Sequence, residues 1–339
     1  MRDVAGHAGV SVGTVSNVLN RPETVSETTR RRVLDAIAAL GFVRNESARH
    51  LRAGRSRTLG LVVLDIANPF FTDVARGVEE VANAEGLAVI LCNSDDRPAK
   101  EAAHLDVLTE HGVQGVLITP TAELSPALEA LRDRDVPVVL VDRQDPRSEH
   151  CSVAVDDVLG GRLAAEHLLE RGHRRIAFVG GPSGLPQVHE RHLGVELAVR
   201  AATRSDDVLT VFSPETLTVA GGREAGVQII GMPAARRPTA AICANDLLAL
   251  GLLQEMVRNS VRVPDDLAIV GYDDIDFAAA AAVPLSSVRK PRFELGRRAA
   301  ELLLDEARNP DHRHEQLLYE PQLVVRESSM VARTEEGIS

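Results

Sequence analysis

The chain has 339 residues, of which 44% are hydrophobic and 3% aromatic, and its formal net charge is −11 at pH 7. This length allows two or three domains, each with a sizeable core. The sequence contains no run of about 18 apolar residues, which excludes a membrane-spanning helix. The three cysteines are far apart and form no CxxC motif, so we expect reduced, mostly buried thiols rather than a disulfide framework.

The charge is unevenly distributed along the chain. Residues 1–57 contain 10 Lys and Arg against 5 Asp and Glu, a net charge of +5, whereas residues 58–339 contain 28 against 44, a net charge of −16. Attraction to phosphate would therefore be confined to the first segment, since the acidic remainder repels nucleic acid. This distribution predicts a small nucleic-acid-binding module joined to a large acidic body.

The first twenty residues predict two short helices joined by a tight turn. Val4 and Ala8 share the apolar face of the first helix, which Gly9 interrupts, and Ser11 occupies the N-cap position of the second. Val15 and the residues after it give the second helix an apolar stripe. Its other face presents short side chains suited to close approach to base edges in the major groove: Val12, Gly13, Ser16, Asn17 and Asn20.

A third helix is expected from about residue 26 to residue 40, with Ser26 as its cap and Gly41 as its stop signal. Three arginines, at positions 30–32, crowd its first half, where like charges oppose the helix dipole, and nearby phosphates would explain them. A basic segment, 45–57, follows and carries one protruding leucine, Leu51.

From residue 58 onward, strands and helices alternate, which predicts parallel sheets with right-handed crossovers. The pattern restarts near residue 156, which indicates two similar lobes. Expected strands are 59–64, 88–92, 115–119, 136–141, 175–179, 208–212, 240–243 and 267–272. Expected helices are 71–85, 99–111, 125–134, 158–171, 188–202, 219–230 and 246–257.

Ligands of such folds bind outside the carboxyl ends of the strands. Five segments directly follow a predicted strand and are expected to converge on one cleft: 68–71, 142–143, 180–191, 245–246 and 273–274.

These features together resemble the lactose/galactose-repressor (LacI/GalR) family of bacterial transcription regulators. The body alone would also resemble periplasmic sugar-binding proteins, but the head and the basic segment are specific to the regulators. The matching segments, in family order, are DVAGHAGVSVGTVSNVLN, VSETTRRRVLDAIAALGFVRNESARHLRAGRSRTLGLVV, NPFF, VQGVLI, VPVVLVDR, HLLERGHRRIAFVGGP, AICANDLLALGLL, VPDDLAIVGYDD and PLSSVRKP.

The resemblance implies an α/β protein with an all-α helix-turn-helix head, 1–44, and a hinge helix or linker, 45–57. A two-lobed, periplasmic-binding-protein-like core of parallel sheets, 58–331, follows, with a tail at 332–339. The first lobe is expected to contain residues 58–156 and 285–318, and the second 157–284 and 319–331. The chain would then cross between lobes near 155–157, 283–285 and 319–321.

The resemblance also implies a homodimer whose two heads bind a pseudo-palindromic operator in double-stranded DNA. The hinge would fold in the minor groove, where Leu51 would wedge between base pairs, although it is alternatively an ordinary linker or core leucine. The expected DNA-binding residues are Ser11, Val12, Gly13, Thr14, Ser16, Asn17, Asn20, Ser26, Thr29, Asn45, Ala48, Arg49 and Leu51.

Two departures from the family pattern affect these expectations. Gly13 has no side chain with which to read a base, so the operator half-site cannot be copied from a relative. Met1 lies only two residues before Asp3, where relatives carry a capping threonine. We therefore expect either a natural start further upstream or a first helix that frays.

In the core, the resemblance implies a binding site for a small effector, and not a catalytic site. Strand-end carboxylates and amides favour a sugar or sugar derivative over a purine. Phe71 is equally consistent with a core role, and Asp142 either lines the cleft or pairs structurally with its neighbour. The expected effector-binding residues are Phe70, Phe71, Arg143, Arg191, Asn245, Asp246 and Asp273.

The remaining motifs predict no metal, cofactor or catalytic residue. His189 and His192 have a metal-compatible spacing but no third ligand nearby in sequence, and segment 311–315 is expected to be a solvated loop. A transport binding protein would not need residues 1–57, and a sugar-metabolising enzyme would need a nucleophile–base pair or phosphate loop. Since the first residues lack a signal peptide, we expect a cytoplasmic, nucleoid-associated, ligand-controlled repressor. Without a leucine heptad near the C-terminus, it would be a dimer.

Overall fold

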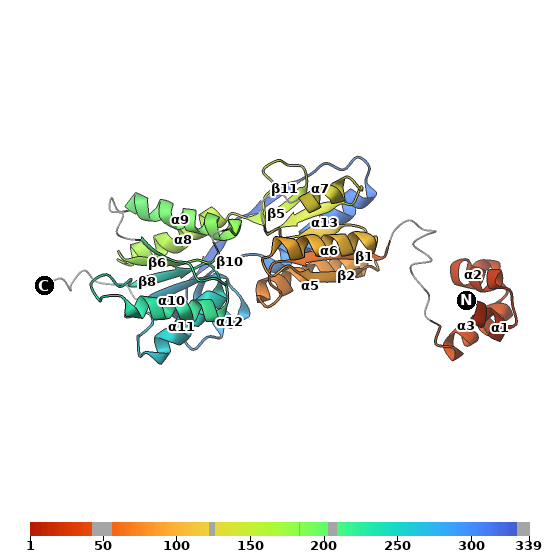
Figure 1. Cartoon of the computed structure of the whole chain (residues 1–339), viewed down its shortest axis with the longest axis horizontal. Coiled ribbons are helices and arrows are strands. Elements are labelled where there is room, and N and C mark those ends of the chain that lie inside the picture. The colour runs from red at the N-terminus through yellow and green to blue at the C-terminus, as the bar shows by residue number, and fades with distance from the viewer. Residues whose placement is uncertain (43–55, 122–125, 183, 203–208, 331–339) are drawn as a thin grey trace. The chain divides into compact units, whose positions relative to one another are not determined.

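The computed structural model describes residues 1–42, 56–121, 126–182, 184–202 and 209–330. The chain divides into two compact units, 1–56 and 57–339 (Figure 1). Four predicted hinge residues lie outside the described residues: Asn45, Ala48, Arg49 and Leu51.

The first unit is helical, as predicted. It contains α1 (Arg2–Ala8), α2 (Val12–Asn20), the 3-10 turn η1 (Pro22–Thr24) and α3 (Glu27–Ala39). Gly9 ends α1 in the left-handed conformation, with φ of 59°, which a side chain would disfavour. The three helices share a small apolar core built from Val4, Ala5, Ala8, Val15, Val18, Val33 and Ala36.

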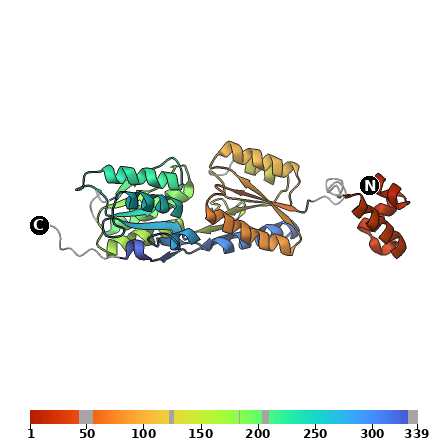
Figure 2. The ribbon, with the colours of Figure 1, turned by 90° about the horizontal axis from the view of Figure 1, so that it is seen from below.

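The second unit contains two lobes, each built around a six-stranded sheet. In the first lobe all strand pairs are parallel. Helices α6 (Pro98–Glu110) and α7 (Pro126–Arg132) cover one face of this sheet, and α5 (Pro69–Ala84) and α13 (Arg292–Arg308) cover the other (Figure 2). The strand order is β11 (Gln316–Tyr319), β5 (Cys151–Val155), β4 (Val138–Val141), β3 (Val116–Ile118), β1 (Thr58–Val63) and β2 (Ala88–Asn93).

The second lobe repeats this design with one antiparallel edge strand, β12. Helices α8 (Asp157–Glu170) and α9 (Pro186–Ala202) pack together on one face, and α10 (Val219–Gly231) and α11 (Asp246–Arg258) on the other (Figure 2). The short helix α12 (Asp276–Ala279) follows β9. The strand order is β12 (Gln322–Val324), β10 (Ser286–Arg289), β9 (Ala268–Asp273), β8 (Ala240–Cys243), β6 (Ile176–Val179) and β7 (Leu209–Phe212).

Three helix pairs pack backbone against backbone through reciprocal glycines. A Cβ built on any of these glycines would lie 2.0–2.1 Å from a carbonyl oxygen of the facing helix. Such a contact leaves no room for a side chain, so the absence of a Cβ fixes how closely the helices approach. The pairs are Gly77 and Gly296 between α5 and α13, Gly161 and Gly194 between α8 and α9, and Gly222 and Gly251 between α10 and α11.

The path between the lobes differs from the sequence prediction at one crossing. Residues from 285 onward were placed in the first lobe, but β10 pairs with β9 in the second sheet. The chain therefore returns to the first lobe only after Arg289. Buried Ser286 and Ser287 explain the misplacement, because a strand with two serines lacks the apolar pattern of its neighbours. No helix of the described residues is long and apolar enough to cross a bilayer.

Candidate functional site

The head presents the N-terminal half of α2 to solvent. Ser11 caps the helix, because its Oγ accepts the Thr14 backbone N–H at 3.0 Å. Val12 is 43% exposed, and Gly13 and Asn17 are also exposed. The apolar side of α2 faces the core of the head, so these positions are free to meet a groove. The remaining predicted α2 contacts are Ser16 and Asn20, whose Nδ2 donates to the Ser16 Oγ at 3.2 Å.

The arginine triplet of α3 is divided between two tasks. Arg30 and Arg31 are exposed, as phosphate contacts would require. The Arg32 guanidinium instead donates to the Ala8 carbonyl at 2.5 Å, satisfying a free carbonyl at the C-terminus of α1. Arg32 is exposed as well, so this bond gives it a structural role in holding α1 against α3, and contact of the three arginines with phosphate stays a prediction. The predicted contacts Ser26 and Thr29 bond to each other through their hydroxyls at 3.0 Å.

In the core, residues of both lobes line a cavity of about 350 Å³. Five of the seven predicted effector residues line it: Phe70, Phe71, Arg191, Asn245 and Asp273. The carboxyl ends of β4, β8 and β9 all reach this cavity, which confirms the placement expected from parallel sheets. Further lining residues include Leu64, Asn68, Asp95, Asp96, Asp142, Gln187, Thr216, Thr218 and Lys290.

A buried lysine joins the two lobes at the cavity. Lys290 follows β10 in the second sheet, and its Nζ donates to both carboxylate oxygens of Asp142, which follows β4 in the first, at 2.8 Å each. The Nζ also lies 3.6 Å from Asp273 Oδ1 and 3.9 Å above the centre of the Phe70 ring. Lys290 is therefore held by one residue of its own lobe and two of the other.

The second cation of the cavity is Arg191 of α9. It donates to Asp157 through Nε at 3.1 Å and through Nη2 at 3.4 Å, and Nη1 donates to the Ala244 carbonyl at 2.5 Å. Its Nη2 lies 4.0 Å from Asp273, and its guanidinium stacks 4.0 Å from the centre of the Tyr272 ring. A planar donor fixed on several sides is preorganised to meet a ligand oxygen.

Burial and these cations act in opposite directions on the neighbouring carboxyl groups. For Asp142, burial is the larger influence and raises the pKa to about 6, against the opposing charge of Lys290. For Asp157, burial is also the largest single influence and raises the pKa, but the charges of Arg191 and Lys290, together with hydrogen bonds from Arg191 and Tyr272, outweigh it and the pKa is lowered. Two cations thus face three carboxylates in a site that is shielded from water.

Two asparagines position helices at the rim of the cavity. Asn68 caps α5 through the Phe70 N–H at 3.0 Å, and its Nδ2 donates across the lobes to Asp273 at 3.3 Å. Asn245 caps α11 through the Leu248 N–H and donates to the Leu217 carbonyl, both at 2.9 Å. Most of the hydrogen-bonding capacity of Asn245 is thus used within the protein.

The structure places the other two predicted effector residues away from the ligand. Asp246 is fully buried, and its oxygens accept the Ile275 N–H at 2.8 Å and the Ser287 hydroxyl at 2.7 Å. Arg143 pairs with Glu190 at 3.3 Å outside the cavity lining. Asp246 and Arg143 are therefore withdrawn as predicted ligand contacts, because the first positions the loop after β9 and the second bonds to a neighbour.

Sequence reasoning missed three residues that the structure brings into the cavity. Lys290 lies in the segment PLSSVRKP, and its strand had not been recognised. Asn68 was included only as part of a strand-end segment. Gln187 donates to the Asp142 carbonyl at 3.4 Å, and its buried Oε1 has no hydrogen-bond partner among the described residues. Had the strand before it been recognised, the position of a basic residue directly after a strand would have identified Lys290.

Comparisons with known proteins agree with this geometry. Residues 1–45 match the model of bacterial regulatory proteins of the lacI family, and residues 165–329 match the periplasmic binding protein-like domain. The HTH-type transcriptional repressor PurR of Aliivibrio fischeri (strain MJ11) is 32% identical over 336 residues, covering 97% of each chain. The PurR repressor of Vibrio cholerae (strain M66-2) is 33% identical over 335 residues, again covering 97% of each.

The chain belongs to the LacI family. Among solved structures, the complex of the transcriptional regulator CelR with cellobiose is similar at 31% identity and a TM-score of 0.71, covering 96% of this chain and 98% of that one. The lac repressor dimer bound to operator and the anti-inducer ONPF is similar at 25% identity and a TM-score of 0.81, covering 97% and 98%. The chain is a DNA-binding transcriptional regulator of the repressor type, with a ligand-binding core.

Proposed function

We propose that this regulator binds operator DNA as a homodimer and that a sugar or sugar derivative in the interlobe cavity controls its affinity for that operator. The observation that carries the proposal is the cavity itself. Fixed carboxylates, a fixed guanidinium and an ammonium surround it, beside the rings of Phe70 and Phe71. Convergent hydrogen-bonding groups beside apolar surface suit a polyhydroxylated ligand.

The size and charge of the cavity narrow the ligand class. A volume of about 350 Å³ lies at the small end of the range for ligand sites, which favours one or two sugar rings over a larger ligand. Two related structures contain sugars, CelR with cellobiose and a regulator of Enterococcus faecium with ribose. The carboxylates of Asp142 and Asp273 can accept hydrogen bonds from the hydroxyl groups of a ligand, and Arg191 can donate one to a hydroxyl or carboxylate oxygen.

The sugar proposal is tested by isothermal titration of a sugar panel into the full-length protein. For the sugar that binds, Arg191→Lys should weaken binding at least tenfold, because the single nitrogen of a lysine cannot span the separate positions from which the guanidinium meets Asp157, Ala244 and a ligand. Arg143→Lys is the matched control and should bind as the wild type does, since Arg143 lies outside the cavity lining. Equal losses in both variants would contradict the site.

The proposed control of DNA binding acts through the segments that cross between the lobes. Asp157 lies just beyond the crossing after β5, and Lys290 lies on the crossing after β10. A ligand that competes for Arg191 or Lys290 alters contacts made by these two segments, and so shifts the relative orientation of the lobes. A coupling of about 1–3 kcal/mol would change operator affinity several-fold to a hundredfold.

On the DNA side, we propose that Val12 and Asn17 read bases and that the hinge inserts Leu51 into the minor groove. The residues proposed to contact the DNA backbone, or to support those that do, are Ser11, Thr14, Ser16, Asn20, Ser26 and Thr29. Asn17→Ala should relax sequence preference at one operator position by about 1–3 kcal/mol. Leu51→Ala should weaken operator binding far more than binding to unrelated DNA at the same salt. Equal losses on both DNAs would contradict the proposed insertion of Leu51 between base pairs.

We propose that the protein acts in the cytoplasm, at the nucleoid, because its proposed roles require operator DNA. The relatives are transcriptional regulators and not enzymes, and we propose no catalysed reaction for this chain. Dimerisation is checked by light scattering of the full-length protein, for which a stable tetramer would be the contrary result.

A further inference from the structure

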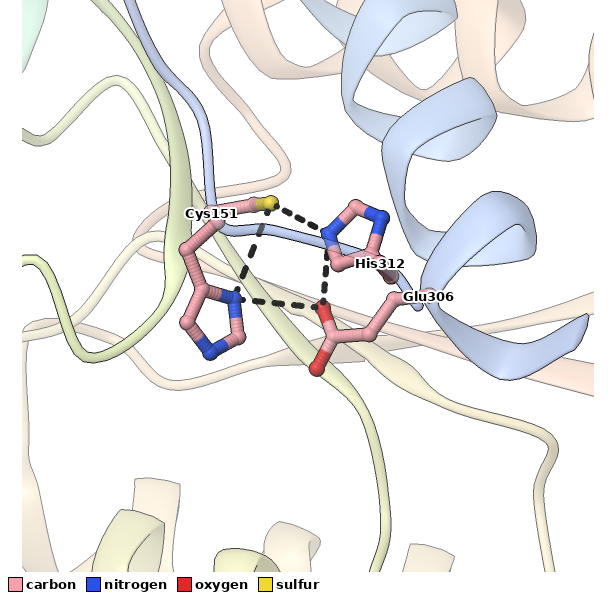
Figure 3. Close-up of side chains that lie close together, drawn as sticks. Cys151, Glu306 and His312 are labelled. Carbon is pink, nitrogen blue, oxygen red and sulfur yellow. Dashed lines mark hydrogen bonds and ion pairs between the residues drawn. The ribbon is translucent and has the colours of Figure 1, made fainter. Parts of the chain in front are cut away.

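Outside the cavity, four metal-ligating side chains from separate parts of the first lobe gather at one point. Cys151 begins β5, Glu306 lies in the last turn of α13, and His312 and His314 lie in the connection from α13 to the edge strand β11. Their ligand atoms all lie within 4.8 Å of one another. Figure 3 shows Cys151, Glu306 and His312 pointing toward a common centre.

We propose that this cluster is a structural binding site for a divalent zinc-type cation. The distances between neighbouring ligand atoms are 3.1 Å from Cys151 Sγ to His312 Nε2, 4.0 Å from that nitrogen to Glu306 Oε2, 3.9 Å from Oε2 to His314 Nδ1 and 3.9 Å from Nδ1 to Sγ. Neighbouring ligands of a tetrahedral zinc ion with these donors are about 3.3–3.6 Å apart. The cluster therefore surrounds a volume of the right size for such an ion.

The surrounding hydrogen bonds prepare the ligands for a cation. Asp305 Oδ2 lies 2.6 Å from His312 Nδ1, so the proton of the neutral ring is held at Nδ1 and the Nε2 lone pair faces the cluster. A carboxylate behind a histidine is the usual second partner of a zinc ligand. On the other side, the Glu315 backbone N–H donates to Cys151 Sγ at 3.2 Å, which favours a thiolate, but burial outweighs this bond and raises the pKa of the thiol to about 11, so the thiolate would require the charge of the bound cation.

Without a cation the cluster is rich in acceptors and poor in protons. Glu306 Oε2 is buried and has no hydrogen-bond partner among the described residues. It faces two imidazole nitrogens and a sulfur, and the thiol proton and, in one tautomer, the ring proton at His314 Nδ1 are too few to serve the four contacts of the cluster. A divalent cation would satisfy all four atoms at once, which explains why a polar group that normally requires a partner is left in this position.

The chemistry of the donors selects the class of metal. One sulfur, two imidazole nitrogens and one carboxylate form a mixed set that suits Zn²⁺ or Co²⁺, whereas Mg²⁺ and Ca²⁺ prefer oxygen ligands alone. Four protein ligands leave no open position, which is typical of a structural zinc site. The ion would fasten the end of α13 and the edge strand β11 to β5.

One residue departs from the solvated loop that the sequence predicts at 311–315. The other four residues of this segment are exposed, but the side chain of His312 is only 6% exposed and packs against Cys151. The sequence could not show this, because Cys151 lies about 160 residues before the two histidines and no standard spacing links them.

The test uses the full-length, reduced protein with Zn²⁺ and then Co²⁺ as the probe. We expect one equivalent of tightly bound zinc per chain, resistant to gel filtration. The cobalt form should show the thiolate-to-metal charge-transfer band in the near ultraviolet and the visible bands of tetrahedral cobalt. Zinc should also raise the thermal midpoint of unfolding, and a chelator should reverse this rise.

Single substitutions then locate the site. Cys151→Ser should abolish the charge-transfer band, and His314→Ala should weaken metal binding at least tenfold. Since His314 is exposed, its variant should fold even where the Cys151 variant does not. Cys92→Ser and His111→Ala are matched controls that should bind cobalt as the wild type does. No stoichiometric metal, or an unchanged cobalt spectrum in both Cys151→Ser and His314→Ala, would overturn the proposal.

Discussion

Lys290, the buried lysine of the cavity, gives the sharpest test of how much a charge pair between the lobes contributes to the stability of the core. Replacing Lys290 by Met keeps the length and apolar stem of the side chain but removes the charge that Asp142 accepts from at 2.8 Å. At an effective dielectric constant of 20, two opposite charges at this distance attract each other by about 6 kcal/mol. The Met variant loses this attraction, but it also avoids the cost of desolvating the lysine, which offsets part of the loss. Breaking a buried pair from one side generally costs about 3–5 kcal/mol.

Protonation of Asp142 sets an upper limit on this cost. Because the pKa of Asp142 in the folded protein is already raised to about 6, protonating this carboxyl at pH 7 costs only about 1.4 kcal/mol, so the penalty that acts through Asp142 should not greatly exceed that value and lies below the general range for a broken buried pair. Without Lys290 the pKa of Asp142 in the folded state rises further. A raised carboxyl pKa costs stability as the pH rises, so the penalty should be largest above pH 7 and should shrink toward pH 4.

The assay is urea unfolding of the core, followed by circular dichroism, with two controls. Lys100→Met removes a partner of Asp95 at 2.6 Å, but both side chains are about a third or more exposed, so a change of at most about 1 kcal/mol is expected. The double variant Asp142→Asn with Lys290→Met should recover most of the loss, since no carboxylate is left unpaired. A Lys290→Met variant as stable as the wild type at pH 8, or a double variant less stable than the single one, would refute the reasoning.

Three further predictions concern the rest of the protein. Gly77→Ala should destabilise the core by about 1–3 kcal/mol, because its Cβ would lie 2.0 Å from the Phe293 carbonyl oxygen. Gly231→Ala is the control and should leave stability unchanged, because its Cβ meets open space among the described residues. Equal thermal midpoints for the two variants would contradict the glycine contacts. Burial, helped by the charge of Arg171, lowers the pKa of His167 from 6.5 to about 4, so its neutral ring contributes stability that is present above pH 6.5 and is lost as the pH falls toward 4. His167→Gln should remove this dependence, and a wild type and variant that lose stability in parallel between pH 6.5 and 4 would disprove the role. Ser11→Asp should keep the cap of α2, and with it the thermal stability of the head, but should weaken operator binding because a carboxylate repels phosphate. Ser11→Ala removes the cap and should lower the stability of the head by about 1 kcal/mol. Unchanged operator affinity for Ser11→Asp would argue against a DNA contact at this position.

The sequence predicted most of the head and the alternating elements of both lobes, because these depend on local patterns. The cap at Ser11, the turn at Gly9 and the apolar runs of the parallel strands all follow from rules that act within a few residues. The last third of the core was harder to predict. Strands β10 and β12 lie at one edge of their sheet and contain polar residues, so their pairing depends on neighbours far away in the chain.

The candidate site shows the same division between local and long-range information. Strand ends identified Asn245 and Asp273 as cavity residues, because a parallel sheet gathers its carboxyl ends at one edge, and the family resemblance added Phe70 and Arg191 within the segments that follow other strands. The prediction could not distinguish a side chain that faces the cavity from one that bonds inward, as Asp246 does. That difference depends on which partners the folded chain brings within reach.

The most direct test of the central claim is the affinity for operator DNA, measured at fixed salt with and without the sugar found by titration. The account predicts a change of several-fold to a hundredfold in the wild type, and in Arg191→Lys a response that requires at least tenfold more sugar. A sugar that binds the core tightly and leaves operator affinity unaltered would contradict the proposed coupling between the cavity and DNA binding.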